Sequence, residues 1–335
     1  MADPARTDRM LVDAYDRHVS DLRVSLTDRC NFRCVYCHNE GLGDTRGPAD
    51  PSGTEMTTDE VVRLLRIARE FDIARVKFTG GEPLLRRDLE SIVAAVSPWM
   101  EVSLTTNGSL LAGRAQGLRD AGLARVNISI DSLDARHFRS VRRGSLEPVL
   151  AGLEAALAAG LAPVKINTVL MDETLGELPE LVDFVAQRDG LELQLIEVMP
   201  EIRTDMQTHR VPLEPVRRWL AERTATVEQR TMHHRNVYTL ANGARVELVD
   251  PVGNAEFCAN CHRVRVTHDG QLKGCLNRLD DYVPTRGLDD EGIRAAFRQV
   301  VADRMPYYGA YHRERYHAAE DPDRLYASLR RPGFR

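Results

Sequence analysis

The sequence lacks the features of a membrane or secreted protein. It has no apolar run long enough to span a bilayer, and residues 1–10 lack the apolar core of a signal peptide. Charge of one sign is not in excess either. The 45 basic and 50 acidic residues give a formal net charge of −5, which offers no general attraction for nucleic acid or a membrane surface. We therefore expect a cytoplasmic protein without a nucleic-acid or membrane partner.

Cysteine is also scarce, but its distribution is informative. The 6 cysteines form two groups of three, spaced C-x3-C-x2-C and C-x2-C-x13-C. The groups are Cys30, Cys34 and Cys37, and Cys258, Cys261 and Cys275. Groups of three cannot pair internally, and cytoplasmic thiols stay reduced, so disulfides are not expected. Both spacings are typical of metal sites.

Apolar runs alternate with helical patterns through the first two thirds of the chain. The expected strands, rich in β-branched residues and Leu, span residues 22–27, 75–79, 102–106, 126–130, 164–170 and 191–197. The helices expected between them span 58–71, 88–96, 111–121, 147–159 and 178–188. This alternation predicts an α/β fold with a parallel sheet wrapped by helices. Periodicity does not choose between a doubly wound sheet and part of a βα-barrel, but in both the chemistry lies at the carboxyl ends of the strands.

The pattern changes after a helix expected near residues 214–222. Two β-hairpins follow, with strands at 237–240 and 245–249 and at 264–267 and 271–274, and then a helix near 291–303. We predict one domain over residues 1–225 and a small α+β domain over residues 226–335, which carries the second cysteine group.

The first cysteine group predicts an iron–sulfur cluster. Thiolates are the usual ligands of such clusters, and three of them on a four-iron cluster leave one iron without a protein ligand. That iron can chelate a small molecule and pass it one electron. Zinc is the alternative, but it normally takes four ligands, and His38, directly after Cys37, is poorly placed for chelation.

The second cysteine group admits two interpretations. C-x2-C followed by a hairpin suits a zinc ribbon, with His262 or His268 as the fourth ligand. The same three thiolates could instead hold a second iron–sulfur cluster. The spacing by itself leaves both open.

The segment from Cys30 to Cys37, with Tyr36 just before the last cysteine, resembles the radical S-adenosylmethionine superfamily. Three segments at strand ends agree with it: Thr-Gly-Gly-Glu-Pro at 79–83, Thr-Thr-Asn-Gly at 105–108 and Asn-Ile-Ser-Ile-Asp at 127–131. Each alone could be a plain turn or polar strand cap. The resemblance implies that the open iron binds S-adenosylmethionine, whose reductive cleavage yields a 5′-deoxyadenosyl radical that abstracts a hydrogen atom. The cofactor contacts that it implies are Tyr36, Gly80, Gly81, Glu82, Thr106 and Ser129.

Taken together, the two cysteine groups resemble one family, the GTP 3′,8-cyclases of molybdenum cofactor biosynthesis (MoaA type). The resemblance runs from about Asp21 to Arg304 and includes Asn-Ala-Glu-Phe-Cys and Arg-x-Arg-x-Thr-x-Asp-Gly around the second group. It implies an incomplete (βα)6 TIM-like barrel and two [4Fe-4S] clusters, the second of which binds the guanine of GTP. The implied reaction removes the ribose 3′ hydrogen of GTP and joins C3′ to C8, which gives 3′,8-cyclo-7,8-dihydro-GTP.

The resemblance also implies the substrate-binding residues. These are Arg23, Arg75, Lys165, Arg263 and Arg265. The guanidinium fork holds phosphate oxygens in a bidentate way. Arg263 and Arg265 alternate with valines, so both should lie on one face of a strand. Any one of these residues alone would more often be a solvated surface charge.

Three positions depart from the family pattern. Gln194 stands where some members have a phosphate-binding Arg, and Asp16-Arg17 replaces Gly-Arg. The printed sequence ends Arg-Arg-Pro-Gly-Phe-Arg rather than Gly-Gly, for which Gly309 or the turn at 332–333 could substitute. Two alternatives therefore stay open: a related two-cluster radical enzyme acting on another nucleotide, a sugar derivative or a peptide, and an iron–sulfur sensor or assembly protein. A low-potential electron donor such as flavodoxin or ferredoxin is the other expected partner, and a homodimer is left open.

Overall fold

The computed structural model describes residues 9–41, 54–199, 206 and 209–312. Its central feature is a row of parallel strands: β1 (Asp21–Ser25), β2 (Arg75–Thr79), β3 (Glu101–Thr106), β4 (Arg125–Ser129), β5 (Val164–Leu170) and β6 (Leu191–Glu197). Each strand pairs with the next one in the sequence. A doubly wound sheet would reverse its order partway, so this sequential order confirms the barrel-like alternative.

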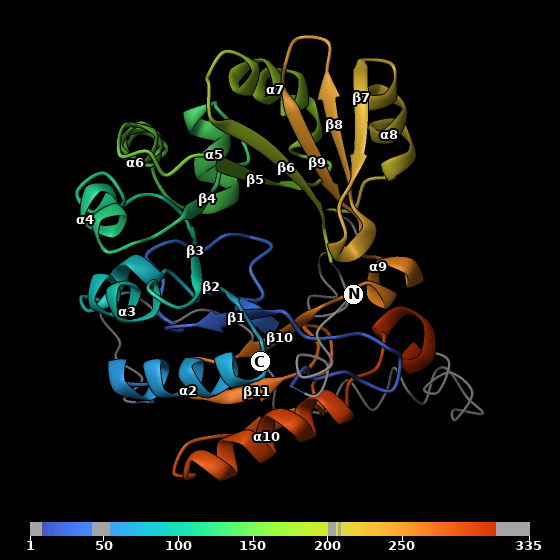
Figure 1. Ribbon diagram of the computed structural model, residues 1–335. Coiled ribbons are helices and arrows are strands. Elements are labelled where there is room, and N and C mark those ends of the chain that lie inside the picture. Colours follow the sequence, from blue (N-terminus) through green and yellow to red (C-terminus); the bar gives the residue numbers. More distant parts are fainter. Residues whose placement is uncertain (1–8, 42–53, 200–205, 207–208, 313–335) are drawn as a thin grey trace, which may run out of the picture.

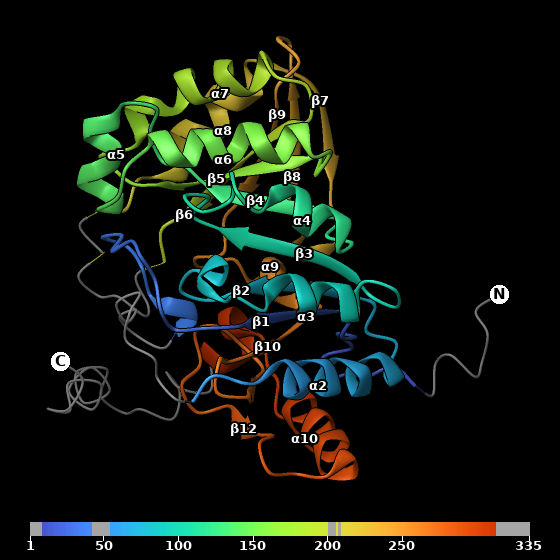
Figure 2. The ribbon, with the colours of Figure 1, turned by 90° about the vertical axis from the view of Figure 1, so that its left-hand side faces the viewer.

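Helices cover the convex side of the curved sheet (Figures 1 and 2). They are α2 (Thr58–Glu70), α3 (Leu89–Val96), α4 (Ala115–Asp120), α5 (Ala135–Arg142), α6 (Glu147–Ala158) and α7 (Leu178–Ala186). The capping box expected at the start of α2 is present, with Thr57 and Glu60 bonded reciprocally. The helix expected at 111–121 is shorter, because residues 109–114 form tight turns before α4. Sequence analysis missed α5, a short helix capped by Asp134 with few apolar positions.

The strands of the last third of the chain extend both edges of the same sheet. On the β1 edge lie β10 (Arg263–Val266), β11 (Gln271–Lys273) and β12 (Tyr282–Pro284). On the β6 edge lie β9 (Arg245–Val249), β8 (Asn236–Leu240) and β7 (Thr224–Gln229). Both predicted hairpins are confirmed. The sequence did not reveal β7, whose side chains are mostly exposed and include only two apolar residues, Ala225 and Val227. The division at residue 225 stays a prediction, since strands on either side of it share one sheet.

The remaining helices close the structure around this sheet. They are α8 (Leu213–Ala221), α9 (Ala255–Ala259) and α10 (Asp290–Ala302), with short turns at η5 (Met232–His234) and η6 (Tyr307–Tyr311). Figure 1 shows α10 beside α2, and α9 on the concave side of the sheet. In the described part of the chain, no helix combines the length and apolarity that crossing a membrane requires. The turn at 332–333 lies outside the described residues.

Candidate active site

The first cysteine group lies in the loop after β1, at the carboxyl end of the parallel strands as expected. Burial, with a smaller contribution from the nearby Cys37, raises the pKa of Cys30 to about 11 and that of Cys34 to about 12. The three thiols are therefore close enough to act on one another. None of the six cysteines, all of which are described, forms a disulfide.

Neither cysteine group is arranged around a single ion. Among the described residues, no three Cys, His, Asp or Glu side chains are placed to share one metal ion. A four-iron cluster binds each thiolate to a different iron, so three thiols per group match a cluster with one open iron.

The loop after β2 presses directly on the cysteine loop. The N–H of Gly81 donates to the carbonyl of Thr27 at 2.7 Å, and that of Glu82 donates to Arg29 at 2.7 Å. A Cβ on Gly81 would lie 2.1 Å from the carbonyl oxygen of Arg29. Gly80 has φ of 151°, and a Cβ there would lie 2.5 Å from the carbonyl oxygen of Thr27. Both glycines are thus required for this packing, whatever they contact in a cofactor.

Glu82 and Thr106 bond to one another beneath the site. The fully buried Glu82 carboxylate accepts hydrogen bonds from the Thr106 hydroxyl at 2.6 Å and from the N–H groups of Asn107 and Leu84. Thr106 therefore faces away from the concave side, and its neighbour Thr105 faces into it, because side chains alternate along a strand. The Thr105 hydroxyl has no hydrogen-bond partner in the described structure. Sequence analysis named Thr106 and missed Thr105.

Tyr36 belongs to a buried polar group between β4 and α5. Its hydroxyl donates to Asp131 at 2.7 Å and accepts from Arg142. Arg142 and Asp131 also form an ion pair at 3.1 Å, with both side chains almost completely buried. The carbonyl oxygen of Arg142 also accepts a hydrogen bond from Cys34 Sγ of the first cysteine group, at 3.9 Å. These three side chains therefore hold the loop after β4 against the loop that carries the first cysteine group.

The second cysteine group lines a cavity of about 350 Å³ on the concave side of the sheet. Cys258 lies on α9, Cys261 just before β10, and Cys275 just after β11. Facing them across the cavity are Tyr36, Thr105 and Ser129 from the barrel strands and loops. The cavity thus joins the expected cofactor side to the second cysteine group.

Three of the five predicted basic residues reach this cavity: Arg23, Arg263 and Arg265. Arg23 and Arg265 are direct neighbours across the β1–β10 pairing. Both contact the Glu40 carboxylate, at 3.7 Å in the case of Arg23. Although burial opposes it, these two cations lower the pKa of Glu40 to about 2. Burial and the adjacent Arg23 and Arg265 lower the pKa of Arg263 to about 9.

The other two predicted residues lie at a second, larger cavity. It has a volume of about 730 Å³ and lies toward the amino ends of the strands. Arg75 is half exposed there and pairs with Asp21 at 2.9 Å. Lys165 pairs with Glu247 at 2.5 Å and with Glu192 at 3.2 Å. Arg23 and Arg263 line both cavities, so the two are adjacent.

Lys77 is a further basic residue at the larger cavity that sequence analysis missed. It lies on β2, and its ammonium donates to Asn127 at 3.1 Å. Burial, followed by the charges of Arg23, Arg263 and Lys165, lowers its pKa well below the usual range. Lys77 has no ion pair among the described residues. Its alternation with Arg75 along β2 was readable in the sequence. A cluster of cations that suppress one another's charge is a site suited to a polyanion.

Comparisons with known proteins match two consecutive parts of the chain to two family models. Residues 24–185 match the family model of the radical SAM superfamily, and residues 191–310 match the model named molybdenum cofactor synthesis C. A probable GTP 3′,8-cyclase of Halobacterium salinarum is 53% identical over 90% of this chain and 91% of its own length. Another, of Methanocella arvoryzae, is 43% identical over 89% and 95%. The crystal structure of Streptococcus suis SuiB bound to S-adenosylmethionine has a TM-score of 0.57 at 14% identity, over 85% of this chain and 67% of that one. The last likeness concerns the fold alone.

Proposed function

Since this chain belongs to the GTP 3′,8-cyclase family of radical S-adenosylmethionine enzymes, we propose that it converts GTP to 3′,8-cyclo-7,8-dihydro-GTP in molybdenum cofactor biosynthesis. Its cofactors are S-adenosylmethionine and an iron–sulfur cluster. The observation that carries the proposal is the single cavity shared by Tyr36, Thr105 and Ser129 on one side and by Cys258, Cys261 and Cys275 on the other.

Each cysteine group holds one [4Fe-4S] cluster in this proposal. Cys30, Cys34 and Cys37 hold the cluster that binds S-adenosylmethionine, and Cys258, Cys261 and Cys275 hold a second one beside the purine. When bound, the first cluster and its ligand supply the radical that removes the ribose 3′ hydrogen. The donor set fits, because each group supplies three thiols, the number that leaves one iron of a four-iron cluster open to a small molecule.

The cofactor contacts follow from the loops at the strand ends. Tyr36 and Ser129 line the cavity, and Thr105 offers it an unpartnered hydroxyl. The other four predicted contacts act mainly by setting the path of the loops that meet the cofactor; these are Gly80, Gly81, Glu82 and Thr106. The two glycines pack against the cysteine loop, and Glu82 and Thr106 bond to one another. We therefore replace the predicted Thr106 by Thr105 as the direct contact.

The basic side chains at the junction of the two cavities bind the triphosphate. Arg23 and Arg263 lie where the cavities meet, with Arg265 on one side and Lys77 and Lys165 on the other. The larger cavity is the better place for the phosphate chain, because Lys77 lies there among other cations without an acidic partner in the described part of the protein. This arrangement holds the ribose near the cofactor side and the purine near the second cysteine group. Arg75, half exposed and paired with Asp21, contributes to the field at the rim.

A low-potential electron donor such as flavodoxin or ferredoxin reduces the first cluster in this scheme. The reaction takes place in the cytoplasm, where thiols that must bind iron stay reduced.

The test is a product assay on the anaerobically reconstituted protein. It is incubated with S-adenosylmethionine, dithionite and GTP deuterated at the 3′ position. We expect deuterium in 5′-deoxyadenosine and a fluorescent pterin after acid conversion of the nucleotide product. Formation of 5′-deoxyadenosine without deuterium and without pterin would contradict the cyclase and favour a related enzyme acting on another substrate. Absence of any 5′-deoxyadenosine would favour the non-enzymatic sensor.

A further inference from the structure

Two arginines are buried behind the second cysteine group. The side chains of Arg17 and Arg304 are 5% and 1% exposed. Arg17 precedes β1, whereas Arg304 follows α10, so the two come from opposite ends of the described chain. Burying a guanidinium is costly unless an anion and hydrogen-bond acceptors surround it.

Both guanidinium groups bond to the backbone of the cysteine loop. Arg17 donates to the carbonyl of Cys258 at 2.8 Å, and Arg304 donates to the carbonyl of Cys261 at 2.7 Å. The stem of Arg304 also lies against Gly274, where a Cβ would come within 2.7 Å of its Cγ. Gly274 immediately precedes Cys275, so Arg304 lies close to two of the three cysteine positions.

The two cations have only one carboxylate between them in the described structure. Asp13 is fully buried and pairs with Arg17 at 2.9 Å and with Arg304 at 3.5 Å. The Nε and one terminal nitrogen of Arg304 have no hydrogen-bond partner there. The group Arg17, Arg304 and Asp13 therefore carries one uncompensated positive charge in a buried place.

Thiolates of Cys258 and Cys261, the residues whose carbonyls accept from the two arginines, would supply the missing negative charge. On the far side of the group, the Asp281 carboxylate accepts from the N–H of Cys275 at 2.8 Å and faces Lys273, while Arg278 pairs with Asp280 at 3.0 Å, so that side has a carboxylate for each cation. The excess positive charge is thus directed at Cys258 and Cys261.

We propose that Arg304, supported by Arg17 and oriented by Asp13, is the counter-charge that holds the second iron–sulfur cluster and sets its reduction potential. This inference rests on the proposed second cluster. Three thiolates give an oxidised four-iron cluster a net negative charge, and reduction makes it more negative. A fixed cation beside it favours binding and reduction alike, since charge and hydrogen bonding around the sulfurs tune such clusters. Arg304 acts as a positioning residue, because it contacts the loop that carries the ligands.

The experiment isolates the second cluster in the full-length chain. Cys30, Cys34 and Cys37 are changed to Ala, the protein is reconstituted anaerobically, and about four irons should remain. Arg304→Gln is then compared with Arg304→Lys in this background. Gln keeps a donor for the Cys261 carbonyl but loses the charge, whereas Lys keeps the charge. We expect Arg304→Gln to lose iron faster to a chelator and to have a more negative reduction potential in a titration followed by electron paramagnetic resonance, and Arg304→Lys to recover both.

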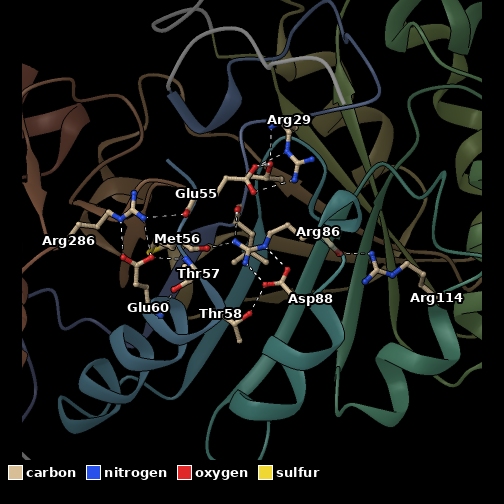
Figure 3. A network of polar contacts seen from close by, with 12 residues as sticks. Arg29, Glu55, Met56, Thr57, Thr58, Glu60, Arg86, Asp88, Arg114 and Arg286 are labelled. Carbon is tan, nitrogen blue, oxygen red and sulfur yellow. Dashed lines mark hydrogen bonds and ion pairs between the residues drawn. The ribbon is translucent and has the colours of Figure 1, made fainter. Parts of the chain in front are cut away.

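Arg86→Gln is the matched control. Arg86 is equally buried, donates to the carbonyls of Leu26 and Met56 at 3.2 and 2.7 Å, and pairs with Asp88 at 2.5 Å (Figure 3). It lies away from the second group, so its loss should lower the stability of the fold without moving the potential.

Three results would overturn the inference or separate it from the proposed function. An Arg304→Gln protein with unchanged potential and iron retention shows that the arginine is only structural. If Arg304→Gln takes up no cluster and Arg304→Lys does not restore it, the role is again structural, whereas recovery with Lys supports the charge. A parent protein that holds no iron at the second group, or holds zinc, refutes the second cluster and with it the role of Arg304, whereas the first two results refute the role of Arg304 alone.

Discussion

At the scale of single residues, two partly buried lysines of the larger cavity differ in what surrounds them. Lys77 lies among Arg23, Arg263 and Lys165 with an amide as its polar contact, while Lys165 pairs with Glu247 and Glu192. We expect Lys77→Met to raise the free energy of unfolding without nucleotide by about 1–3 kcal/mol, because it removes a partly buried amine that lies among cations and has no acidic partner among the described residues. Lys165→Met, the matched control, should lower it. Thermal unfolding measures both.

The same two variants should both weaken GTP binding, by roughly ten- to a hundredfold, if each contributes a charge-assisted hydrogen bond to the phosphates. Equilibrium binding under anaerobic conditions measures this. Equal destabilisation of the two folds, or unchanged affinity in Lys77→Met, would show that Lys77 is not part of a phosphate site.

Single residues also show where sequence reasoning stopped. The threonine pair at the end of β3 was predicted to lie at the site, but the partner of Thr106 is Glu82, 24 residues away, and only the fold shows which hydroxyl is left without a partner among the described residues. Lys165 was predicted from resemblance, yet its partner Glu247 comes from a strand 82 residues later. Long-range pairing of this kind has no local signal.

At the scale of elements, the loop after β2 determines where the cysteine loop after β1 lies. Gly81→Ala would drive a Cβ into the carbonyl of Arg29, and neither backbone can yield without moving the cysteine ligands. We expect this variant to hold about four irons instead of about eight after reconstitution and to form no 5′-deoxyadenosine. Gly113→Ala is the control, since nothing lies within 4 Å of its added Cβ. Full iron content in Gly81→Ala would mean that the cysteine loop tolerates displacement.

The elements themselves were largely predictable, because strands buried on both faces and capped helices have strong local patterns. The strands at 75–79, 164–170 and 191–197 were placed to the residue. The exposed β7 was not found, because its two apolar residues are too few to mark a strand. Nor could periodicity show that β10 adds to β1 in parallel, which is the pairing that sets Arg265 beside Arg23. That pairing joins segments about 240 residues apart and depends on tertiary packing.

At the scale of the whole molecule, the basic side chains that line the cavities come from strands along the entire sheet. Arg23 lies on β1, Lys77 on β2, Lys165 on β5 and Arg263 on β10, so a bound polyanion would neutralise charges from both cysteine-bearing parts of the chain at once. Ligand binding to the folded state alone raises stability by RT ln(1 + [L]/Kd), which is about 2.7 kcal/mol at a hundredfold excess over Kd. We therefore expect GTP to raise the midpoint of anaerobic thermal unfolding, with a smaller effect at high salt because the screening length shortens.

Two fragments of GTP, tripolyphosphate and guanosine, show which part of the protein binds the nucleotide. Inorganic tripolyphosphate should reproduce part of the GTP effect, since it carries the charge that the basic residues meet. Guanosine should produce little, since it cannot neutralise Arg23, Lys77 or Arg263. Lys77→Met should lose most of the tripolyphosphate effect. If guanosine stabilises the protein as strongly as GTP, the purine side of the cavity provides most of the binding. The basic residues would then have a structural role in the sheet and would not bind the phosphates of the substrate.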